Sequence, residues 1–347
     1  MIITGAELRP LVLKLSQPFS TGHTIFYERY IWIIKVFIEN EEFIGEISPL
    51  PEFNSENGTT INESFDLFSS LIPEKLELNT LEEITHLLKQ FGTTPAFKSG
   101  LEQALLQAYT STHQIHLTSL FNKESFLSTI PVNATVGILD TIKTLECIRE
   151  LMEIGFRCFK MKVGRKYLDD DIRIINSVFD SFGDQIEIRL DANRCWKFGQ
   201  AVTFFQGINH LPITYIEEPV TDFEQFRALR NYTHIPLAAD ESIHDIRTAK
   251  EVIKEGFADV LVVKPGVFGG IISSMDLIEN AHEHNKRTTI TSSLDTPLGK
   301  RKAVITAALI GHASPCGLDT VRFFLDNPFD DLYPVVNAQI YCGDLKL

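Results

Sequence analysis

Between residues 130 and 320, short apolar runs alternate with longer stretches in which apolar residues keep the spacing of an amphipathic helix. The expected strands are residues 132–136, 158–163, 186–191, 214–217, 236–240, 259–264 and 288–292, with a weaker one at 316–319. Regular alternation of strands and helices predicts right-handed crossovers and a parallel sheet. This repetition favours a closed (β/α) barrel, and an open doubly wound sheet is the alternative.

The first part of the chain has a different texture and predicts an α+β unit. Its expected strands are residues 8–15, 30–38 and 42–47, and its expected helices are residues 61–72, 80–91 and 98–111. The third strand can pair with the second across Glu39–Glu41. We therefore divide the chain into an α+β cap (1–125), a barrel (126–320) and a C-terminal segment that returns to the cap (321–347).

Charged residues follow five successive strands of the expected barrel. They are Lys160 and Lys162, Asp191, Glu217, Asp240 and Lys264. From Lys162 onward, successive members are 23 to 29 residues apart, which is about one strand, one helix and two loops. Residues one such unit apart become neighbours around the mouth of a barrel, where barrel enzymes place their active sites.

The residue types suggest a chemistry for this mouth. Asp191, Glu217 and Asp240 would repel one another without a cation, and oxygen ligands favour a hard cation such as Mg²⁺, with Mn²⁺ as an alternative. Lys160 and Lys162 alternate along one strand and so point the same way. A divalent cation beside a lysine base suits removal of a proton α to a carboxylate. A single strand-end acid is more often a helix N-cap, but caps alone do not explain five charged strand ends in succession.

Composition narrows the function classes further. The chain of 347 residues carries a formal charge of −14, which argues against nucleic acid and anionic membranes as partners. We find no pattern of a signal peptide or a membrane span. The five cysteines are scattered and never spaced as CxxC, so we expect neither disulfides nor a zinc site, and a cytoplasmic location.

The strand-end motifs resemble the enolase superfamily, in particular its muconate-lactonising subgroup. They are Lys160-Met-Lys162, Asp191-Ala-Asn193, Glu217-Glu-Pro219, Asp240-Glu-Ser242 and Lys264-Pro265. The resemblance implies a TIM barrel of the (β/α)7β type with an α+β N-terminal capping domain. Within the subgroup the chain is most similar to the o-succinylbenzoate synthases. The stretches that carry this are Gly45–Phe53, Arg189–Arg194, Ile216–Pro219, Val263–Pro265 with Gly269-Gly270, and Gly317–Thr320.

The resemblance implies roles for the charged residues. Lys162 would remove the proton α to the carboxylate of 2-succinyl-6-hydroxy-2,4-cyclohexadiene-1-carboxylate and return it to the departing hydroxyl. Asp191, Glu217 and Asp240 would hold the Mg²⁺ ion that stabilises the enediolate. Lys264 would stabilise the intermediate ring as a cation, and Lys160 would orient the carboxylate and disfavour the protonated form of Lys162. The reaction would be a lyase step of menaquinone biosynthesis.

The resemblance is less specific about the substrate's surroundings. The candidate substrate-binding residues are Asn193, Arg189, Thr291, Ser292, Ser293 and Gly317. Asn193 would bond the metal's ligands or the substrate, Arg189 would support the site from deeper in its strand, and Thr291–Ser293 either contact a second carboxylate or simply end a strand. Loops 20–23 and 49–53 would close over the mouth. Asp295 stands where the family more often has Glu.

Two other interpretations stay open. The same lysines would serve an N-acylamino acid racemase or a dipeptide epimerase, in which Lys162 and Lys264 act as two bases. Against the epimerase, Gly317-Leu318-Asp319 lacks the first Asp of the D-x-D element that holds an α-ammonium group in that family. The third interpretation is a barrel that has lost catalysis. The sequence does not predict the oligomeric state.

Overall fold

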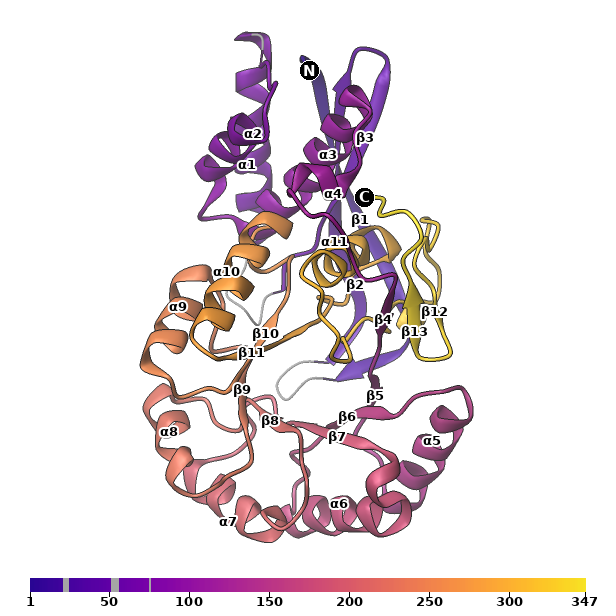
Figure 1. Ribbon diagram of the computed structural model, residues 1–347, viewed down its shortest axis with the longest axis vertical. Helices are drawn as coiled ribbons and strands as arrows, with labels where there is room; N and C mark the ends of the chain where they lie inside the picture. Colours follow the sequence, from indigo (N-terminus) through magenta and orange to yellow (C-terminus); the bar gives the residue numbers. More distant parts are fainter. Residues whose placement is uncertain (21–24, 51–55, 75) are drawn as a thin grey trace.

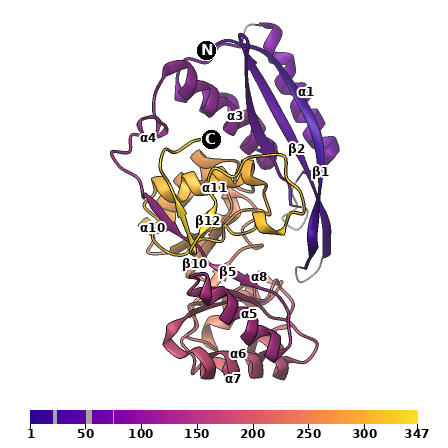
Figure 2. The ribbon, with the colours of Figure 1, turned by 90° about the vertical axis from the view of Figure 1, so that its right-hand side faces the viewer.

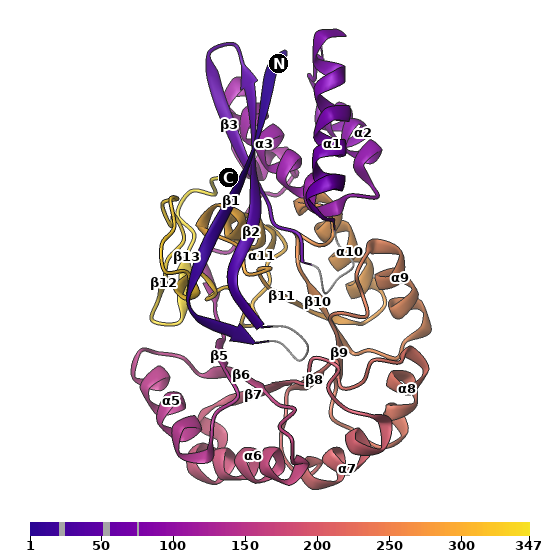
Figure 3. The same cartoon turned by 180° about the vertical axis from the view of Figure 1, so that it is seen from behind.

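Three antiparallel strands open the chain. The computed structural model describes residues 1–20, 25–50, 56–74 and 76–347. Strands β1 (Ile3–Ser20), β2 (Ile25–Ile38) and β3 (Glu41–Ile47) form a sheet in that order, so the expected pairing of the second and third strands is confirmed. Figures 1 and 3 show this sheet extending from the cap down beside the barrel.

Helices pack against the cap sheet. They are α1 (Gly58–Leu71), α2 (Leu81–Leu88), α3 (Pro95–His113) and the short α4 (Leu117–Leu120). The three expected helices are confirmed, with ends that differ by a few residues. Helix α3 lies directly on β3, because a Cβ atom on Gly45 would stand 1.9 Å from the carbonyl oxygen of Gly100. Only glycines allow the two backbones to approach this closely.

The barrel strands run parallel and neighbour one another in chain order. They are β5 (Ala134–Val136), β6 (Cys158–Lys162), β7 (Glu187–Asp191), β8 (Tyr215–Glu217), β9 (Leu237–Ala239), β10 (Val260–Val263) and β11 (Arg287–Ile290). The helices that follow them are α5 (Thr141–Glu153), α6 (Leu168–Phe182), α7 (Phe198–Ile208), α8 (Phe223–Ala228), α9 (Ile246–Glu255), α10 (Ile271–Glu283) and α11 (Pro297–Leu309). Figures 1 and 2 show these helices outside the strands. A doubly wound sheet would reverse its strand order at one point, so that alternative is excluded.

The expected eighth strand at 316–319 is wrong as a strand, but its residues close the ring. Cys316 and Gly317 make isolated parallel bridges to Val132 and Thr291, on the two sides of the gap between β5 and β11. The amide of Gly317 donates to the carbonyl of Ile290 at 2.9 Å. A bridge on each side suffices to complete a (β/α)7β barrel, although the segment is too short for a ladder.

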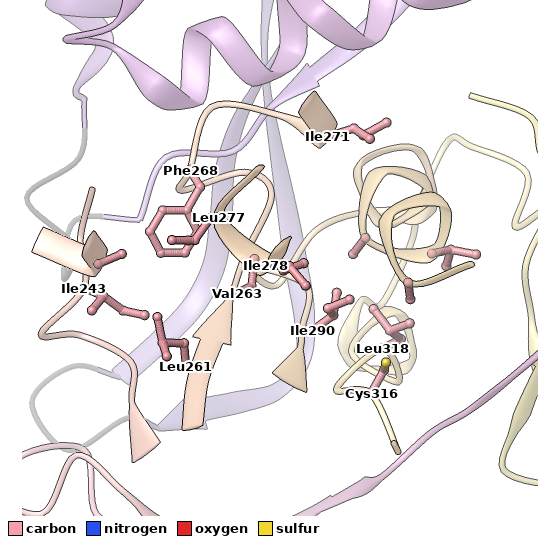
Figure 4. Packing of buried hydrophobic residues seen from close by; sticks show 14 of the residues in the cluster. Ile243, Leu261, Val263, Phe268, Ile271, Leu277, Ile278, Ile290, Cys316 and Leu318 are labelled. Atoms are coloured by element: carbon pink, nitrogen blue, oxygen red, sulfur yellow. The ribbon is translucent and has the colours of Figure 1, made fainter. Parts of the chain in front are cut away.

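The core of the barrel lies between its strands and the surrounding helices. Figure 4 shows Leu261 and Val263 of β10 near Leu277 and Ile278 of α10, and all four belong to one continuous buried cluster. Helix α11 is buried over its whole length, whereas α5 to α9 expose one face. Within the described ranges, no helix is both long and apolar enough to cross a membrane.

The C-terminal segment pairs with the strand that leads into the barrel. Strands β12 (Val335–Val336) and β13 (Gln339–Tyr341) form an antiparallel sheet with β4 (Thr129–Pro131). The carbonyl of Leu347 accepts hydrogen bonds from Gln107 of α3 at 2.9 Å and from Arg301 of α11 at 3.0 Å. The end of the described chain is therefore attached to both the cap and the barrel.

Candidate active site

The register of the barrel brings the charged strand ends to one level. Lys162 pairs with Asp191 across β6 and β7, and Asp191 pairs with Glu217 across β7 and β8. Asp240 directly follows β9, and Lys264 directly follows β10. None of these acids is a helix N-cap, since Asp222 caps α8 and Asp245 caps α9. The N-cap interpretation of the strand-end acids is therefore wrong.

The three lysines lie among the three carboxylates. Lys160 Nζ is 2.8 Å from Asp191 Oδ2 and 2.7 Å from Glu217 Oε1. Lys162 Nζ is 2.7 Å from the same Asp191 oxygen, and Lys264 forms an ion pair with Asp240. Hence the structure brings together all six strand-end residues that the sequence singled out.

Burial and mutual charge shift the pKa values in this cluster. Burial and the neighbouring charge of Asp191 raise the pKa of Glu217 well above its ordinary value. Burial also disfavours the charged form of Asp191, but Lys160 and Lys162 outweigh it and lower the pKa of Asp191. Burial would lower the pKa of Lys160, yet the carboxylates around it, Asp191 first, raise it. A dense, mutually dependent set of charges of this kind is typical of catalytic sites.

Asn193 extends the network to a residue that the sequence analysis missed. Its Oδ1 accepts a hydrogen bond from Lys162 Nζ at 2.6 Å, and its Nδ2 donates to Glu241 Oε1 at 2.9 Å. Burial and the neighbouring Asp240 raise the pKa of Glu241 to about 8. Asn193 has a φ of 42°, a left-handed backbone conformation that is uncommon outside glycine and concentrates at functional sites. The position of Glu241 directly after Asp240 was the available signal.

A cavity of about 100 Å³ opens on this network. Among the predicted substrate-binding residues, its lining includes Asn193, Thr291, Ser292, Ser293 and Gly317. Leu50, from the loop that the sequence analysis expected over the mouth, also lines it, and the residues of its lining that were not selected as site residues are Phe26, Asn133, Thr135, Glu241, Leu294, Asp319 and Thr320. The volume is below the roughly 300 to 1,000 Å³ of typical ligand sites, so a bound ring requires lining side chains to shift.

Of the three hydroxyl groups at the end of β11, those of Thr291 and Ser292 have partners within the barrel, whereas Ser293 Oγ is buried without a hydrogen-bond partner. Thr291 Oγ1 donates to the carbonyl of Gly317 at 2.9 Å, and Ser292 Oγ is 2.7 Å from Thr320 Oγ1. Arg189 lies deeper and does not line the cavity. Its Nη1 donates to the carbonyl of Pro315 at 2.7 Å. Arg189 therefore fills the barrel interior below the site.

Two remaining predictions concern Asp295 and the loops over the mouth. Asp295 Oδ2 accepts the backbone N–H of Ser293 at 2.9 Å, so its shorter side chain bonds its own loop. The expected loop residues 21–23 and 51–53 lie outside the described residues. Leu50, which directly precedes the second gap, lines the cavity.

A larger hollow of about 580 Å³ lies between α3 of the cap and helices α9 and α10. Its lining carries cations such as Lys98 and Lys250, but also the acids Asp245 and Asp276. None of the charged strand ends lines it. Convergent charge and buried, perturbed acids favour the smaller cavity as the reactive site.

The donor set of the smaller cavity fits a hard divalent cation by type. Asp191, Glu217 and Asp240 offer carboxylate oxygens only, and Glu217 Oε2 is buried without a hydrogen-bond partner. Within the part of the chain that is described, no three acidic, histidine or cysteine side chains already form a metal-binding group, and lysine ammonium groups lie between the acids. In this structure the lysine ammonium groups neutralise these carboxylates.

Comparison with known proteins gives a family. The family model described as "Enolase C-terminal domain-like" matches residues 143–342. Curated relatives include o-succinylbenzoate synthase of Desulfotalea psychrophila, 23% identical over 94% of this chain and 96% of that protein. L-Ala-D/L-Glu epimerase of Bacillus subtilis is 26% identical over 99% of this chain and 93% of that protein. Protein PHYLLO of Arabidopsis thaliana is 28% identical over 85% of this chain, which spans 18% of that longer protein.

Solved structures share the whole fold. Muconate lactonizing enzyme from Pseudomonas fluorescens superimposes with a TM-score of 0.89 at 18% identity, over 99% of this chain and 95% of that one. The dipeptide epimerase from Enterococcus faecalis, complexed with Mg and the dipeptide L-Leu-L-Tyr, gives 0.88 at 23% identity, over 100% of this chain and 98% of that one. The expected barrel with an N-terminal cap is confirmed.

Proposed function

This chain belongs to the enolase superfamily, and we propose that it is an o-succinylbenzoate synthase acting in menaquinone biosynthesis. The reaction is the dehydration of 2-succinyl-6-hydroxy-2,4-cyclohexadiene-1-carboxylate to 2-succinylbenzoate. The curated relatives named for this activity and those named for epimerisation are about equally similar to the chain, so the choice depends on the cavity.

The observation that carries the choice is the wall formed by Gly317 and Asp319. A Cβ atom on Gly317 would stand 2.6 Å from Thr291 Oγ1 and 3.0 Å from Thr291 Cβ, so an aspartate there would require the Thr291 side chain to shift. The neighbouring carboxylate of Asp319 lies 2.9 Å from Arg322 Nε and is balanced by it. A wall without a pair of available carboxylates is poorly suited to an α-ammonium group. This wall therefore argues against a dipeptide epimerase.

Lys162 is the base in the proposed mechanism. As a neutral amine, its Nζ takes the proton from C1, α to the ring carboxylate. The resulting ammonium then gives the proton to the hydroxyl leaving C6, so that water departs and the C1–C6 double bond completes the aromatic ring. Asn193 and Asp191, which contact Lys162 Nζ, hold the amine in place. Lys160 orients the ring carboxylate, and Lys264 faces the intermediate ring as a cation.

Asp191, Glu217 and Asp240 would hold a divalent cation, Mg²⁺ or Mn²⁺. When bound, the cation supplies positive charge for the enediolate formed by proton removal. Three carboxylates, one with a buried oxygen that lacks a partner, support this assignment. We place the reaction in the cytoplasm, in keeping with five free cysteines.

Turnover tests the proposal directly. Purified protein with Mg²⁺ is mixed with the cyclohexadiene acid, and formation of the aromatic product is followed by ultraviolet absorbance. A parallel sample receives N-succinylamino acids or dipeptides in D₂O, and deuterium at the α carbon is measured. We expect dehydration to be the faster reaction. Deuterium exchange without dehydration would show that the chain is a racemase or an epimerase instead.

A further inference from the structure

Arg29 of β2 connects two walls of the reactive cavity. Its side chain is 3% exposed, and its guanidinium donates to cap carbonyls and to barrel carbonyls at once. On the cap side the acceptors are Pro49 at 2.6 Å and Ser48 at 3.1 Å. On the barrel side they are Ser293 at 3.2 Å and Leu294 at 3.3 Å. One planar cation thus holds the loop after β3 against the loop after β11.

Glu46 of β3 binds backbone N–H groups where the same barrel loop enters α11. One carboxylate oxygen accepts the backbone N–H of Thr296, and the other accepts that of Gly299, each at 3.1 Å. The Thr296 hydroxyl also donates to Glu46. A Cβ atom on Gly299 would stand 2.4 Å from Glu46 Oε1, so the fully buried carboxylate requires glycine at this position. The cap therefore binds the carbonyls of this loop with one residue and its amides with another.

The loops after β3 and β11, to which Arg29 and Glu46 bond, supply Leu50 and Leu294 to the apolar part of the cavity wall. On the cap side, Leu50 directly follows the two residues whose carbonyls accept hydrogen bonds from Arg29. On the barrel side, the accepting carbonyls belong to Ser293 and Leu294, which line the cavity themselves. Leu294 has a φ of 56°, a conformation that is costly for a branched side chain and persists only when neighbours hold it. Arg29 stabilises this conformation, because it donates to the carbonyl before the Leu294 N–H and to the carbonyl of Leu294 itself.

We propose that Arg29 and Glu46 are positioning residues that set the shape of the substrate cavity, by holding Leu50 on its cap side and Leu294 on its barrel side. Neither residue lines the cavity, so each acts through the loops it binds. Only the identity of the substrate rests on the proposed function. The alternative is that the two residues simply attach the cap.

A matched control separates positioning from attachment. Lys98 of α3 donates to Ser273 Oγ of α10 at 2.7 Å, so it is another cap cation, here half-buried, bonded to the barrel. It contacts neither the loop after β3 nor the loop after β11. Loss of attachment alone predicts similar effects for Arg29→Met and Lys98→Met, whereas positioning predicts an effect on the cavity for Arg29→Met only.

The first readout is amide hydrogen exchange in the absence of substrate, over a peptide that contains residues 292–299. We expect Arg29→Met and Glu46→Gln to exchange at least ~10-fold faster there, because each bond to a charged group contributes about 1.5 kcal/mol or more. Lys98→Met should leave this peptide unchanged. This readout needs no turnover, so it stands even if the proposed reaction is wrong.

The second readout is the division between KM and kcat for the substrate that the wild type turns over. We expect Arg29→Met to raise KM ~10-fold with a smaller change in kcat, since the wall binds substrate but supplies no reacting group. Arg29→Lys keeps the positive charge but has fewer donors, so its KM should lie between those of the wild type and Arg29→Met. It replaces Arg29→Met in the test if Arg29→Met does not fold. The proposal would be overturned if the Arg29 variants showed the amide exchange and KM of the wild type. It would also be overturned if Lys98→Met changed both quantities by as much as Arg29→Met does.

Discussion

Two groups of buried cations differ in what neutralises them. The mouth lysines, Lys160, Lys162 and Lys264, each contact a carboxylate of the strand ends. The α11 cations, Lys300, Arg301 and Lys302, are also buried, and each donates to a backbone carbonyl; Lys300 in addition forms an ion pair with Asp331 at 2.7 Å. The acceptors of the α11 cations belong to Tyr333, Leu347 and Glu46 respectively.

The difference distinguishes a reactive site from a structural joint. Carbonyl dipoles hold the α11 cations between α11, the cap and the C-terminal segment, and burial lowers the pKa of Lys302. In the mouth, carboxylates raise the pKa of Lys160, and a carboxylate oxygen of Glu217 stays without a partner. Several opposite charges grouped at one cavity can be exchanged for a ligand or a proton, whereas charges bonded to backbone carbonyls between packed elements are held by the fold.

The largest expected effect is on turnover when the base is removed. Lys162→Ala should reduce kcat by ~10³-fold, within the range that general acid–base catalysis contributes. Ultraviolet absorbance of the product measures the rate. Circular dichroism and the thermal midpoint should remain close to wild type, because Asn193 keeps Glu241 as a second partner. A variant as active as the wild type would remove Lys162 from the mechanism.

A pair of identical substitutions tests the comparison itself. Lys160→Met should lower kcat/KM by at least ~100-fold, because it removes a cation that contacts two carboxylates. Lys300→Met should leave kcat/KM near wild type but reduce the free energy of unfolding by about 2 kcal/mol, because it removes the ion pair with Asp331 and leaves the Tyr333 carbonyl without its lysine donor. Steady-state kinetics give kcat/KM and urea unfolding gives the free energy of unfolding for each of the two variants. Similar losses of activity in both would contradict the distinction.

The barrel and its mouth were predictable because both depend on periodic signals. Strand-end charges such as Asp191 and Glu217 recur once per strand and helix, and the parallel register places them side by side. The prediction of an eighth strand was wrong because Cys316 and Gly317 close the ring with single bridges, which leave little pattern in the sequence.

The buried joints could not be predicted from local patterns. Lys300, Arg301 and Lys302 are three consecutive charged residues, a pattern typical of a solvent-exposed segment. Only partners that are distant in the sequence explain their burial. Arg29 is similar, because its acceptors lie on two loops that are far apart in the sequence. The sequence shows which side chains are charged, but tertiary contacts decide whether a buried charge meets a carboxylate or a carbonyl.

Binding of Mg²⁺ should stabilise the protein through the mouth alone. At a concentration ~100 times the dissociation constant, a ligand specific for the folded state adds about 2.7 kcal/mol, so the thermal midpoint should rise by several degrees. Glu217→Gln should abolish the rise, and Glu102→Gln, a buried acid of α3 outside the mouth, should retain it. Scanning fluorimetry with and without EDTA measures both. A rise of equal size in Glu217→Gln would place the cation elsewhere.

The last effect is a pH dependence of stability at the cap–barrel boundary. Burial raises the pKa of Glu102 to about 7, although Lys98 and the backbone N–H groups of Ile271 and Ile272 oppose the shift. Because this folded-state pKa exceeds the unfolded value of about 4.3, the contribution of Glu102 to stability is highest below pH 4 and falls until pH 7, by up to about 3 kcal/mol. Glu102→Gln cannot ionise, so relative to wild type it should gain stability between pH 4.5 and pH 8. Urea unfolding at both pH values measures the gain, and the difference cancels any constant cost of the substitution. Parallel stability curves for the two proteins would show that Glu102 is ionised throughout, and that backbone N–H groups suffice to hold a buried charge at this boundary.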